Sequence, residues 1–372
     1  MSQDNAAAST RTTLPAYPLL SAAQLLDQPP LTAVELDRIA ELCAVVFETT
    51  NDVVLFQAEA ILALEAVARS VASAGTVAVN IVTGPYGGGF GEWMREAGAD
   101  VTDIVSDFDD VADPQAVAST IREIKPSVVA LVHAEAATGG TNDVSTIFAA
   151  AKEVGAVTIL DSVAAIGAEP VHAAEWGADI VVLGGQKALA GPAGVSAVAV
   201  SDHAWALIDA NESAPRSSSL SLIDWRDHWL RTDRSIIPGL PSWLEGRALL
   251  AALERVVAEG VGAVNRRHVA AAAATRAGVR ALGLELWQKG AGVAPIATTI
   301  RVPQGDAAAA LLTLDTGLVT QGNGSLRGQL LRVNHYGRAA SLLSVIEAVQ
   351  TLADALGVDA LAAVAAARAA WL

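Results

Sequence analysis

Residues 181–192 read VVLGGQKALAGP, an apolar run that gives way to a glycine-rich loop. The apolar residues predict a buried strand that begins at Ile180, and the glycines after them predict a loop where the strand ends. Lys187 stands in that loop, outside the core but held close to it. An amine in this position is well placed to form a Schiff base with an aldehyde. Taken alone, Lys187 would more often be a solvated loop residue.

Asp161 ends a second apolar run, residues 156–160, which also predicts a buried strand. Taken alone, an aspartate there would more often cap a helix. A carboxylate on one strand end and an amine on a later one are, however, the two groups that a pyridoxal enzyme needs. The acid keeps the pyridine nitrogen protonated, so that the ring withdraws electrons, and the amine holds the aldehyde and moves the proton. Together, Asp161 and Lys187 favour the catalytic interpretation.

Apolar, β-branched runs alternate with helical patterns from residue 55 to about residue 200. Strands that are apolar on both faces and joined by helices indicate an α/β fold with a mostly parallel sheet flanked by helices. Ligands of such sheets bind at the carboxyl ends of the strands, where Asp161 and Lys187 fall. The predicted strands are 77–82, 101–105, 128–132, 157–160, 180–183 and 195–200, and the predicted helices are 58–74, 114–124 and 144–154.

The chain is predicted to have three parts. These are an N-terminal arm over 1–50, a large α/β domain over 51–255 and a small α+β domain over 256–372. The arm is expected to be disordered over 1–13 and helical near 33–49. One long helix is expected over 244–282 and a strand over 298–302. The less regular stretch 211–243 indicates loops near the site or a subunit contact.

The composition narrows the possible partners. A formal charge of −16 argues against nucleic acid and anionic membrane surfaces, because both reward clustered lysine and arginine. The single cysteine, Cys43, excludes an internal disulfide and suggests no metal cluster. Residues 1–13 lack the basic-then-apolar layout of a secretory signal. The apolar stretch 358–372 carries charged residues, which favours a packed amphipathic helix over a membrane span. We therefore expect a cytoplasmic protein that acts on small molecules and holds no metal.

Several motifs in one order resemble the class V aminotransferases of the alanine–glyoxylate group. They are DSVAAIG at 161–167 and GQKAL at 185–189, followed by Pro192 and Gly194. The resemblance covers roughly residues 50–340. It implies a fold-type-I pyridoxal enzyme that forms a homodimer, or a dimer of dimers, with the active site at the subunit interface. It also implies that Lys187 forms the Schiff base and that Asp161 partners the pyridine nitrogen.

The resemblance assigns further residues. Tyr86, in GPYG at 84–87, would stack on the pyridine ring, and Thr138, in HAEAATG at 133–139, would meet the ring's phenolic oxygen. Gln186 would contact the cofactor, and Arg332, in LRVNH at 331–335, would clamp the substrate carboxylate with its planar fork. Each residue has a structural alternative. Tyr86 could be a core aromatic, Thr138 could shape a turn, and Arg332 could pair with a surface acid. We expect His133 to be a hydrogen-bonded structural residue.

The expected phosphate site departs from the family pattern. Relatives place a Ser/Thr/Gly-rich turn before the first long helix, where hydroxyls and N–H groups meet the cofactor phosphate. This chain has LFQAEAI at 55–61, without serine, threonine or glycine. A carboxylate at Glu59 would repel a phosphate dianion but could accept a hydrogen bond from a neutral hydroxymethyl group. The alternative is that Glu59 only caps the helix.

The second half of the phosphate site is also weakened. Relatives bring a hydroxyl from the partner subunit within a segment that matches 238–245, where this chain has PGLPSWLE and keeps only Ser242. Both departures resemble pyridoxamine–pyruvate aminotransferases, as do YGGGFG at 86–91, APR at 214–216 and SLIDW at 221–225. This similarity implies amino transfer between pyridoxamine and a small 2-oxo acid, pyruvate to alanine, in vitamin B6 degradation. Pyridoxal or pyridoxamine would be a substrate rather than a resident cofactor.

One mismatch leaves the acceptor open. The enzymes that the chain resembles have a second arginine where this chain has Asn323, and Arg327 or Arg216 could replace it. The main alternative is an ordinary pyridoxal-phosphate aminotransferase acting on alanine, serine or glyoxylate, with the phosphate held by main-chain N–H groups. A lyase or desulfurase is disfavoured because Cys43 lies outside the motifs. A binding module without activity is disfavoured by the joint presence of Lys187, Asp161 and Arg332.

Overall fold

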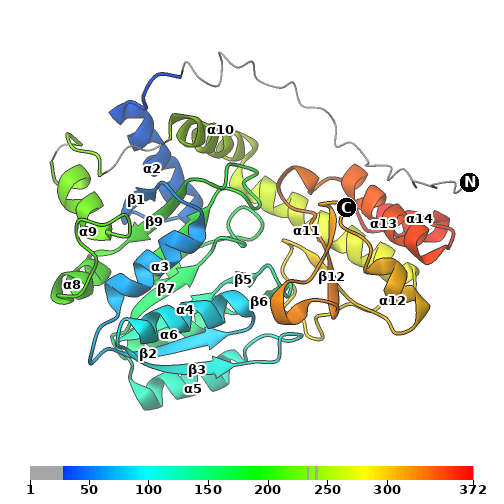
Figure 1. Cartoon of the computed structure of the whole chain (residues 1–372), viewed down its shortest axis with the longest axis horizontal. Helices are drawn as coiled ribbons and strands as arrows, with labels where there is room; N and C mark the ends of the chain where they lie inside the picture. Colours follow the sequence, from blue (N-terminus) through cyan, green and yellow to red (C-terminus); the bar gives the residue numbers. More distant parts are fainter. Residues whose placement is uncertain (1–27, 233, 239–241, 372) are drawn as a thin grey trace, which may run out of the picture.

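The computed structural model describes residues 28–232, 234–238 and 242–371 (Figure 1). The predicted disorder over 1–13 and the first part of the predicted arm lie outside these residues. The described part of the arm contains α2 (Ala33–Phe47), close to the helix predicted over 33–49. Thr32 and Glu35 form a reciprocal capping box at its start, and Glu48 ends it in a left-handed conformation. None of the helices within these residues is long and apolar enough to cross a membrane.

A seven-stranded sheet forms the centre of the molecule, and its predicted α/β, mostly parallel character is confirmed. Its strand order is β1-β9-β8-β7-β4-β2-β3. The five strands from β8 to β3 run parallel, whereas β9 and β1 are antiparallel to their neighbours. The strands are β1 (Asp52–Phe56), β2 (Val77–Val82), β3 (Asp100–Val105), β4 (Val128–Val132), β7 (Val157–Asp161), β8 (Ile180–Gly184) and β9 (Ser196–Val200).

Helices cover the sheet and close one continuous apolar core. Helix α3 packs on β8 and β9, α4 packs on β2, β3 and β4, and α6 packs on β4 and β7 while also contacting α5. Phe47, Phe148 and Met94 are among the largest side chains that are fully buried. The helices are α3 (Ala60–Val71), α4 (Pro85–Glu96), α5 (Pro114–Ile124), α6 (Val144–Glu153), α7 (Ala173–Trp176) and α8 (Asp202–Ala210).

Some local predictions were wrong or incomplete. Strand β1 and helices α4, α7 and α8 were not predicted, and in α4 the glycines hide the helical pattern. The predicted helix 244–282 is two helices, α10 (Trp243–Glu259) and α11 (Val261–Ala281). Gly260 separates them with a φ of 90°, a left-handed conformation that a residue with a side chain rarely adopts.

The C-terminal part has a small antiparallel sheet with β12 at its centre, in the order β10-β12-β11. The predicted strand 298–302 corresponds to β10 (Thr298–Arg301). This sheet and its helices lie together beside the large sheet (Figure 1). The predicted domain boundary at 255/256 falls inside α10, and the division into domains stays a prediction. The remaining elements are β11 (Val319–Gln321), β12 (Leu330–Val333), α12 (Asp306–Leu311), α13 (Leu342–Leu356) and α14 (Leu361–Ala370).

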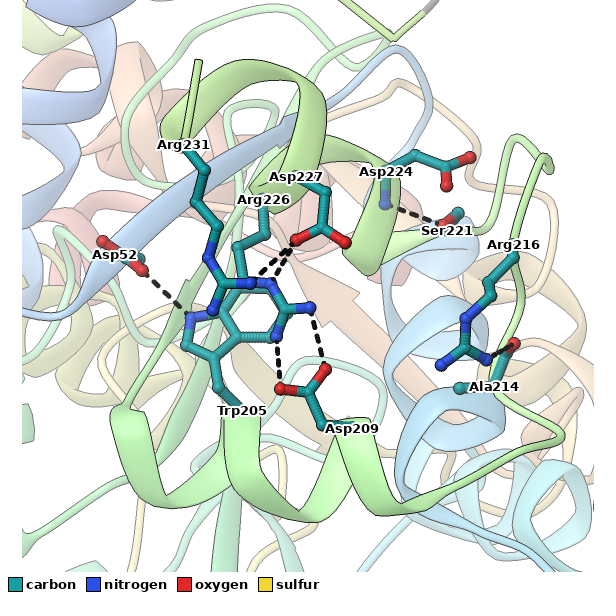
Figure 2. Close-up of polar contacts among 10 residues, drawn as sticks. All are labelled: Asp52, Trp205, Asp209, Ala214, Arg216, Ser221, Asp224, Arg226, Asp227 and Arg231. Atoms are coloured by element: carbon teal, nitrogen blue, oxygen red, sulfur yellow. Dashed lines mark hydrogen bonds and ion pairs between the residues drawn. The ribbon is translucent and has the colours of Figure 1, made fainter. Parts of the chain in front are cut away.

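The stretch 211–243, predicted as loops, contains α9 (Leu222–Asp224) and the π-helix η1 (Trp225–Leu230). The buried guanidinium of Arg226 holds η1 against α8 (Figure 2). It lies 2.8 Å from Asp209 on α8 and 2.8 Å from Asp227 on η1, over the ring of Trp205. Charge-assisted contacts on both sides of one guanidinium thus tie η1 to α8.

Candidate active site

A cavity with about 400 Å³ of empty space, part of it open to solvent, lies at the carboxyl ends of the central parallel strands. Four of the predicted site residues line it: Glu59, Tyr86, Asp161 and Lys187. Register explains part of this convergence, because Asp161, the last residue of β7, pairs with Val132, the last residue of β4. The neighbouring strand β8 pairs with Asp161 through Val182 and continues to Gly184, shortly before Lys187. Apolar side chains from α3 and from the ends of β4 and β7 complete the wall.

Asp161 is the last residue of β7 and only 9% of it is exposed. The backbone N–H of Val163 donates to its Oδ1 at 3.0 Å. Burial raises the pKa of Asp161 to about 6, and the charge of Glu59 adds to that rise, whereas the Val163 N–H and Lys187 oppose it. The carboxyl group tightens the turn that follows β7 and does not begin a helix. It lines the cavity, where a positively charged ligand group would stabilise its ionised form against the cost of burial.

Lys187 follows β8 and is half-buried, so it is not a solvated loop residue. Its Nζ lies 5.8 Å from the ring centroid of Tyr336. Burial lowers the pKa of Lys187 and so does the charge of Arg332, while the acids around the cavity act in the opposite direction. A lysine in such surroundings loses its proton more readily than a free one and becomes nucleophilic.

Glu59 has two functions in the structure, since it caps α3 and also lines the cavity. Its Oε2 accepts the N–H of Ile61 at 2.9 Å, and its Oε1 accepts a hydrogen bond from Nε2 of Gln186. The N–H of Leu62 donates to the backbone carbonyl of Glu59 at 3.0 Å. Two N–H groups that could bind a phosphate at this helix start are therefore already bonded. Oε1 of Gln186 is buried without a partner.

Tyr86 stands in the first turn of α4, and 40% of it is exposed, which excludes an ordinary core aromatic. Its side chain forms part of the cavity wall. Burial raises the pKa of its hydroxyl, and the nearby charge of Glu135 adds to the rise. The ring therefore offers a largely apolar surface to a planar ligand in the cavity.

Arg332 lies on β12 and approaches the cavity from the small sheet. Its Nη1 is 3.5 Å from the carbonyl of Ala136, a cavity residue, and its Nη2 is 3.4 Å from Oγ1 of Thr320. Both contacts are long, and Nε is buried without a partner. Within the described residues no carboxylate lies within ion-pair distance of Arg332, unlike most arginines of the large domain. Its guanidinium is therefore available for an anionic ligand.

Thr138, predicted to contact the ring, is not among the residues that line the cavity. Thr138 is fully buried, and its hydroxyl donates to the carbonyl of Thr83 at 3.3 Å. Its own carbonyl accepts hydrogen bonds from Gln288 and Thr299. This geometry matches the alternative in which Thr138 shapes the turn before Gly139, and its contact with a ring stays a prediction.

The other residues considered from sequence lie outside the cavity wall. His133 is buried beside Trp176, with its Nε2 at 3.8 Å from Glu169, and burial lowers its pKa to about 4. Arg216 points its guanidinium at the carbonyl of Ala214, within its own segment (Figure 2). Ser242 caps α10 with its hydroxyl.

Glu135 was missed from sequence. It is fully buried between Ala134 and Ala136, which both line the cavity. Burial raises its pKa to about 8, and the charge of Asp161 contributes to that rise. The signal available in the sequence was one acidic residue inside an otherwise apolar motif that follows a strand.

The sequence pattern of the class V aminotransferases matches residues 36–312. The chain is 34% identical over 338 residues to pyridoxamine–pyruvate transaminase of Mesorhizobium japonicum, which covers 89% of this chain and 86% of that protein. It is 30% identical to serine–glyoxylate aminotransferase of Methylorubrum extorquens, over 68% of this chain and 66% of that protein.

A solved structure of pyridoxamine–pyruvate aminotransferase from Mesorhizobium loti superposes with a TM-score of 0.86 at 31% identity, covering 93% of this chain and 92% of that one. Ureidoglycine–glyoxylate aminotransferase from Bacillus subtilis has the same TM-score at 24% identity and supports the fold. The extent of the family match and the identity of these relatives show that this chain belongs to the class V aminotransferases, with a fold-type-I architecture and aminotransferase activity.

Proposed function

We propose that this aminotransferase moves an amino group between pyridoxamine and a small 2-oxo acid, with pyruvate to alanine as the preferred pair and vitamin B6 degradation as the setting. The observation that carries the proposal is the carboxylate of Glu59 in the cavity wall at the start of α3. A phosphate group in its usual place would lie against this carboxylate. The hydroxymethyl group of an unphosphorylated ring would instead offer it a hydrogen-bond donor.

The residues of the cavity fit a vitamin B6 ring. Class V aminotransferases depend on pyridoxal phosphate, and the bound ring supplies an electron sink for the reacting amine. Asp161, with a pKa of about 6, is mostly ionised at neutral pH and is suited to hold a protonated pyridine nitrogen. Tyr86 offers a planar surface for the ring. The unpartnered Oε1 of Gln186 offers an acceptor near Glu59.

The electrostatics at Glu59 favour a neutral ring substituent. Unit charges about 4 Å apart interact by roughly 4 kcal/mol at an effective dielectric near 20, and screening reduces this value. Repulsion of even a quarter of that size is worth a several-fold preference for pyridoxal over pyridoxal phosphate. The N–H groups of Ile61 and Leu62 offer little compensation, because both are already bonded.

Lys187 and Arg332 have separate proposed roles, in proton transfer and in binding of the substrate carboxylate. Lys187 would be the amine that holds the ring's aldehyde carbon, with loss of water, and would move the proton between the ring-side carbon and the substrate carbon. Its lowered pKa supports this acid–base role. Arg332 binds the carboxylate of the oxo acid with a guanidinium that has no acidic partner among the described residues.

Titration calorimetry with pyridoxal and with pyridoxal phosphate tests the proposal. The wild type is expected to bind pyridoxal several-fold more tightly, and Glu59→Gln is expected to narrow the gap by removing the charge. Glu65→Gln is the matched control, because Glu65 lies on the same helix but pairs with Arg69 at 2.7 Å outside the cavity wall. It should leave the preference unchanged. Tighter binding and catalytic use of pyridoxal phosphate by the wild type would overturn the proposal.

The competing function is a pyridoxal-phosphate aminotransferase of the alanine–glyoxylate or serine–glyoxylate type. The similarity to serine–glyoxylate aminotransferase of Methylorubrum extorquens favours it. The colour of the desalted protein separates the two functions. A protein that stays yellow after desalting holds the phosphorylated cofactor, and a colourless protein that yellows on addition of pyridoxal uses the free vitamin.

We further propose a cytoplasmic homodimer, or a dimer of dimers, in which the partner subunit completes the active site. The family resemblance of residues 161–194 supports this assembly. Light scattering of the purified protein would show a mass of at least twice the 38.0 kDa of one chain. A stable and active monomer would exclude the shared site.

A further inference from the structure

Glu135 is a buried acid directly behind the cavity wall. It is the second residue of the short strand β5 (Ala134–Glu135), and its side chain has no exposure to solvent. No lysine or arginine forms an ion pair with it in the described ranges. A buried carboxyl group without a cation is costly unless its oxygens are hydrogen-bonded, so its partners identify what it does.

The partners of Glu135 include the first free N–H of α4. Helix α4 has Gly84 at its N-cap, which offers no side chain, and Pro85 at the next position, which has no N–H. The next donor is the backbone N–H of Tyr86, which lies 3.3 Å from Oε2 of Glu135. The other oxygen, Oε1, accepts the N–H of Ala137 at 3.3 Å. A residue 49 positions later in the chain therefore caps this helix.

The contact between Glu135 and the helix start is tight. A Cβ atom on Gly84 would lie 2.2 Å from Cγ and 2.3 Å from Cδ of Glu135. Such distances are far below van der Waals contact, so any side chain at position 84 would displace the carboxyl group or the helix. The backbone of Gly84 is extended, with a φ of 178°, so the requirement for glycine comes from this packing and not from its φ.

We propose that Glu135 is a positioning residue that fixes the first turn of α4 and thereby holds the ring of Tyr86 in the wall of the cavity. The inference rests on the part of the proposed function in which Tyr86 contacts the vitamin B6 ring. It does not depend on whether that ring carries a phosphate. The charged and titratable groups around Glu135 are Asp161, Lys187 and Tyr86.

The protonation of Glu135 suits this position. Its pKa of about 8 leaves it mostly neutral at pH 7, where it adds little negative charge beside Asp161. A neutral carboxyl group still accepts the N–H of Tyr86 through its carbonyl oxygen. The cavity thereby keeps Asp161 as the acid that can ionise for the ring, while Glu135 supports the wall.

A double-mutant cycle with Tyr86 tests the inference. The readout is the Kd of pyridoxine, whose ring has no amine or aldehyde to react with Lys187, and the KM values of both substrates provide a second readout. Glu135→Ala and Tyr86→Ala are each expected to weaken pyridoxine binding about three- to tenfold, the range of one aromatic contact. The double variant should be no weaker than Tyr86→Ala alone, because both changes remove the same contact. The KM for the oxo acid should stay within about twofold of wild type, since Arg332 is untouched.

Two further variants keep the test decisive. Gly84→Ala keeps the acid but crowds it, and it should weaken pyridoxine binding in the same way. It also replaces Glu135→Ala in the cycle if that variant does not fold. Glu169→Gln is the matched control, because Glu169 is a largely buried acid that bonds to Thr141 and lies outside the cavity wall. It should leave ring binding unchanged.

Additive losses in the cycle, or an equal rise of KM for both substrates, would show that Glu135 acts through general stability and would overturn the inference. Unchanged ring binding in Glu135→Ala would overturn it as well. Running the cycle with pyridoxal phosphate separates this inference from the proposed function. Coupling between Glu135 and Tyr86 supports the inference with either ligand, whereas the preference between the ligands concerns only Glu59.

Discussion

Gln186 and Glu59 are joined by a hydrogen bond from Nε2 of Gln186 to Oε1 of Glu59. The residue next to the predicted catalytic lysine therefore orients the carboxylate at the start of α3. Because Oε2 of Glu59 is held by Ile61 as well, the carboxylate is fixed on both sides. A fixed acceptor loses little entropy when a ligand hydroxyl bonds to it.

Replacing Gln186 by leucine should leave Glu59 less well oriented. A hydrogen bond to a charged group contributes about 1.5–3 kcal/mol, so the KM for pyridoxamine is expected to rise roughly tenfold or more while the KM for the oxo acid changes little. Steady-state kinetics with each substrate varied in turn measures both values. If the two KM values rise together, Gln186 supports the loop around Lys187 and not the carboxylate.

Replacing Lys187 by alanine should lower turnover by at least about 10²–10⁴-fold, since the variant lacks both the amine and the acid–base group. The fold should survive because the side chain is only half-buried. Circular dichroism and single-turnover kinetics check the two expectations. Lys152→Ala, which changes an exposed lysine of α6, should keep normal turnover. Near-normal transamination without Lys187 would contradict its assignment.

Replacing Arg332 by lysine should raise the KM for the oxo acid about tenfold or more and that for pyridoxamine far less, because a point charge replaces a bidentate fork. Arg301→Lys is a suitable control on the neighbouring strand β10, since Arg301 pairs with Asp109 at 3.0 Å. It should leave both values near wild type. Equal effects on both substrates in Arg332→Lys would mean that Arg332 is structural.

The raised pKa of Glu135 predicts a pH dependence of stability. The carboxyl group titrates near 4.5 in the unfolded chain and at about 8 in the folded one. Between these values the folded state keeps a proton that the unfolded state has lost, so raising the pH favours unfolding. The slope is about 1.4 kcal/mol per pH unit for one group, and it ends above the folded pKa.

Urea unfolding of wild type and Glu135→Gln across this pH range measures the effect. Glutamine cannot ionise, so the stability of the wild type relative to the variant should fall as the pH rises from about 5 to about 8. Glu169, whose pKa is also raised by burial, is present in both proteins and cancels in the difference. Parallel stability profiles would show that Glu135 does not carry a proton into the folded state.

The central strands β4, β7 and β8 were predictable because they are buried on both faces and read as nearly continuous apolar runs. Helix α4 was not, since its glycines are poor helix formers and their use becomes visible only in three dimensions. A Cβ on Gly87 would lie 3.0 Å from the carbonyl of Ile81, and one on Gly91 would lie 2.6 Å from Nδ2 of Asn80. Glycine is required at these positions because α4 packs closely on β2, and this packing cannot be recognised from the local sequence pattern.

The candidate site shows the same division. Glu59, Asp161 and Lys187 could be placed from sequence because each follows or precedes a recognisable element whose end points to one edge of the sheet. The direction of a short side chain in a loop could not be predicted. The hydroxyl of Thr138, for example, donates to the carbonyl of Thr83. Glu135 was hidden for a related reason, as a glutamate is usually solvent-exposed and only its burial reveals a structural partner.

Arg332 stands on the central strand of the small sheet, whereas Asp161 ends β7 of the large sheet and Lys187 lies in the loop after β8. The two substrates therefore depend differently on how the sheets sit against each other. With the proposed roles, a vitamin ring between Asp161 and Tyr86 would contact only the part of the molecule built around the large sheet, whereas the oxo acid would also contact Arg332 on the small sheet. A small displacement of one sheet against the other would leave affinity for the vitamin unchanged and retune affinity for the acid. Acceptor preference could then change through residues packed between the two sheets, without a change in the residues proposed to contact the ring.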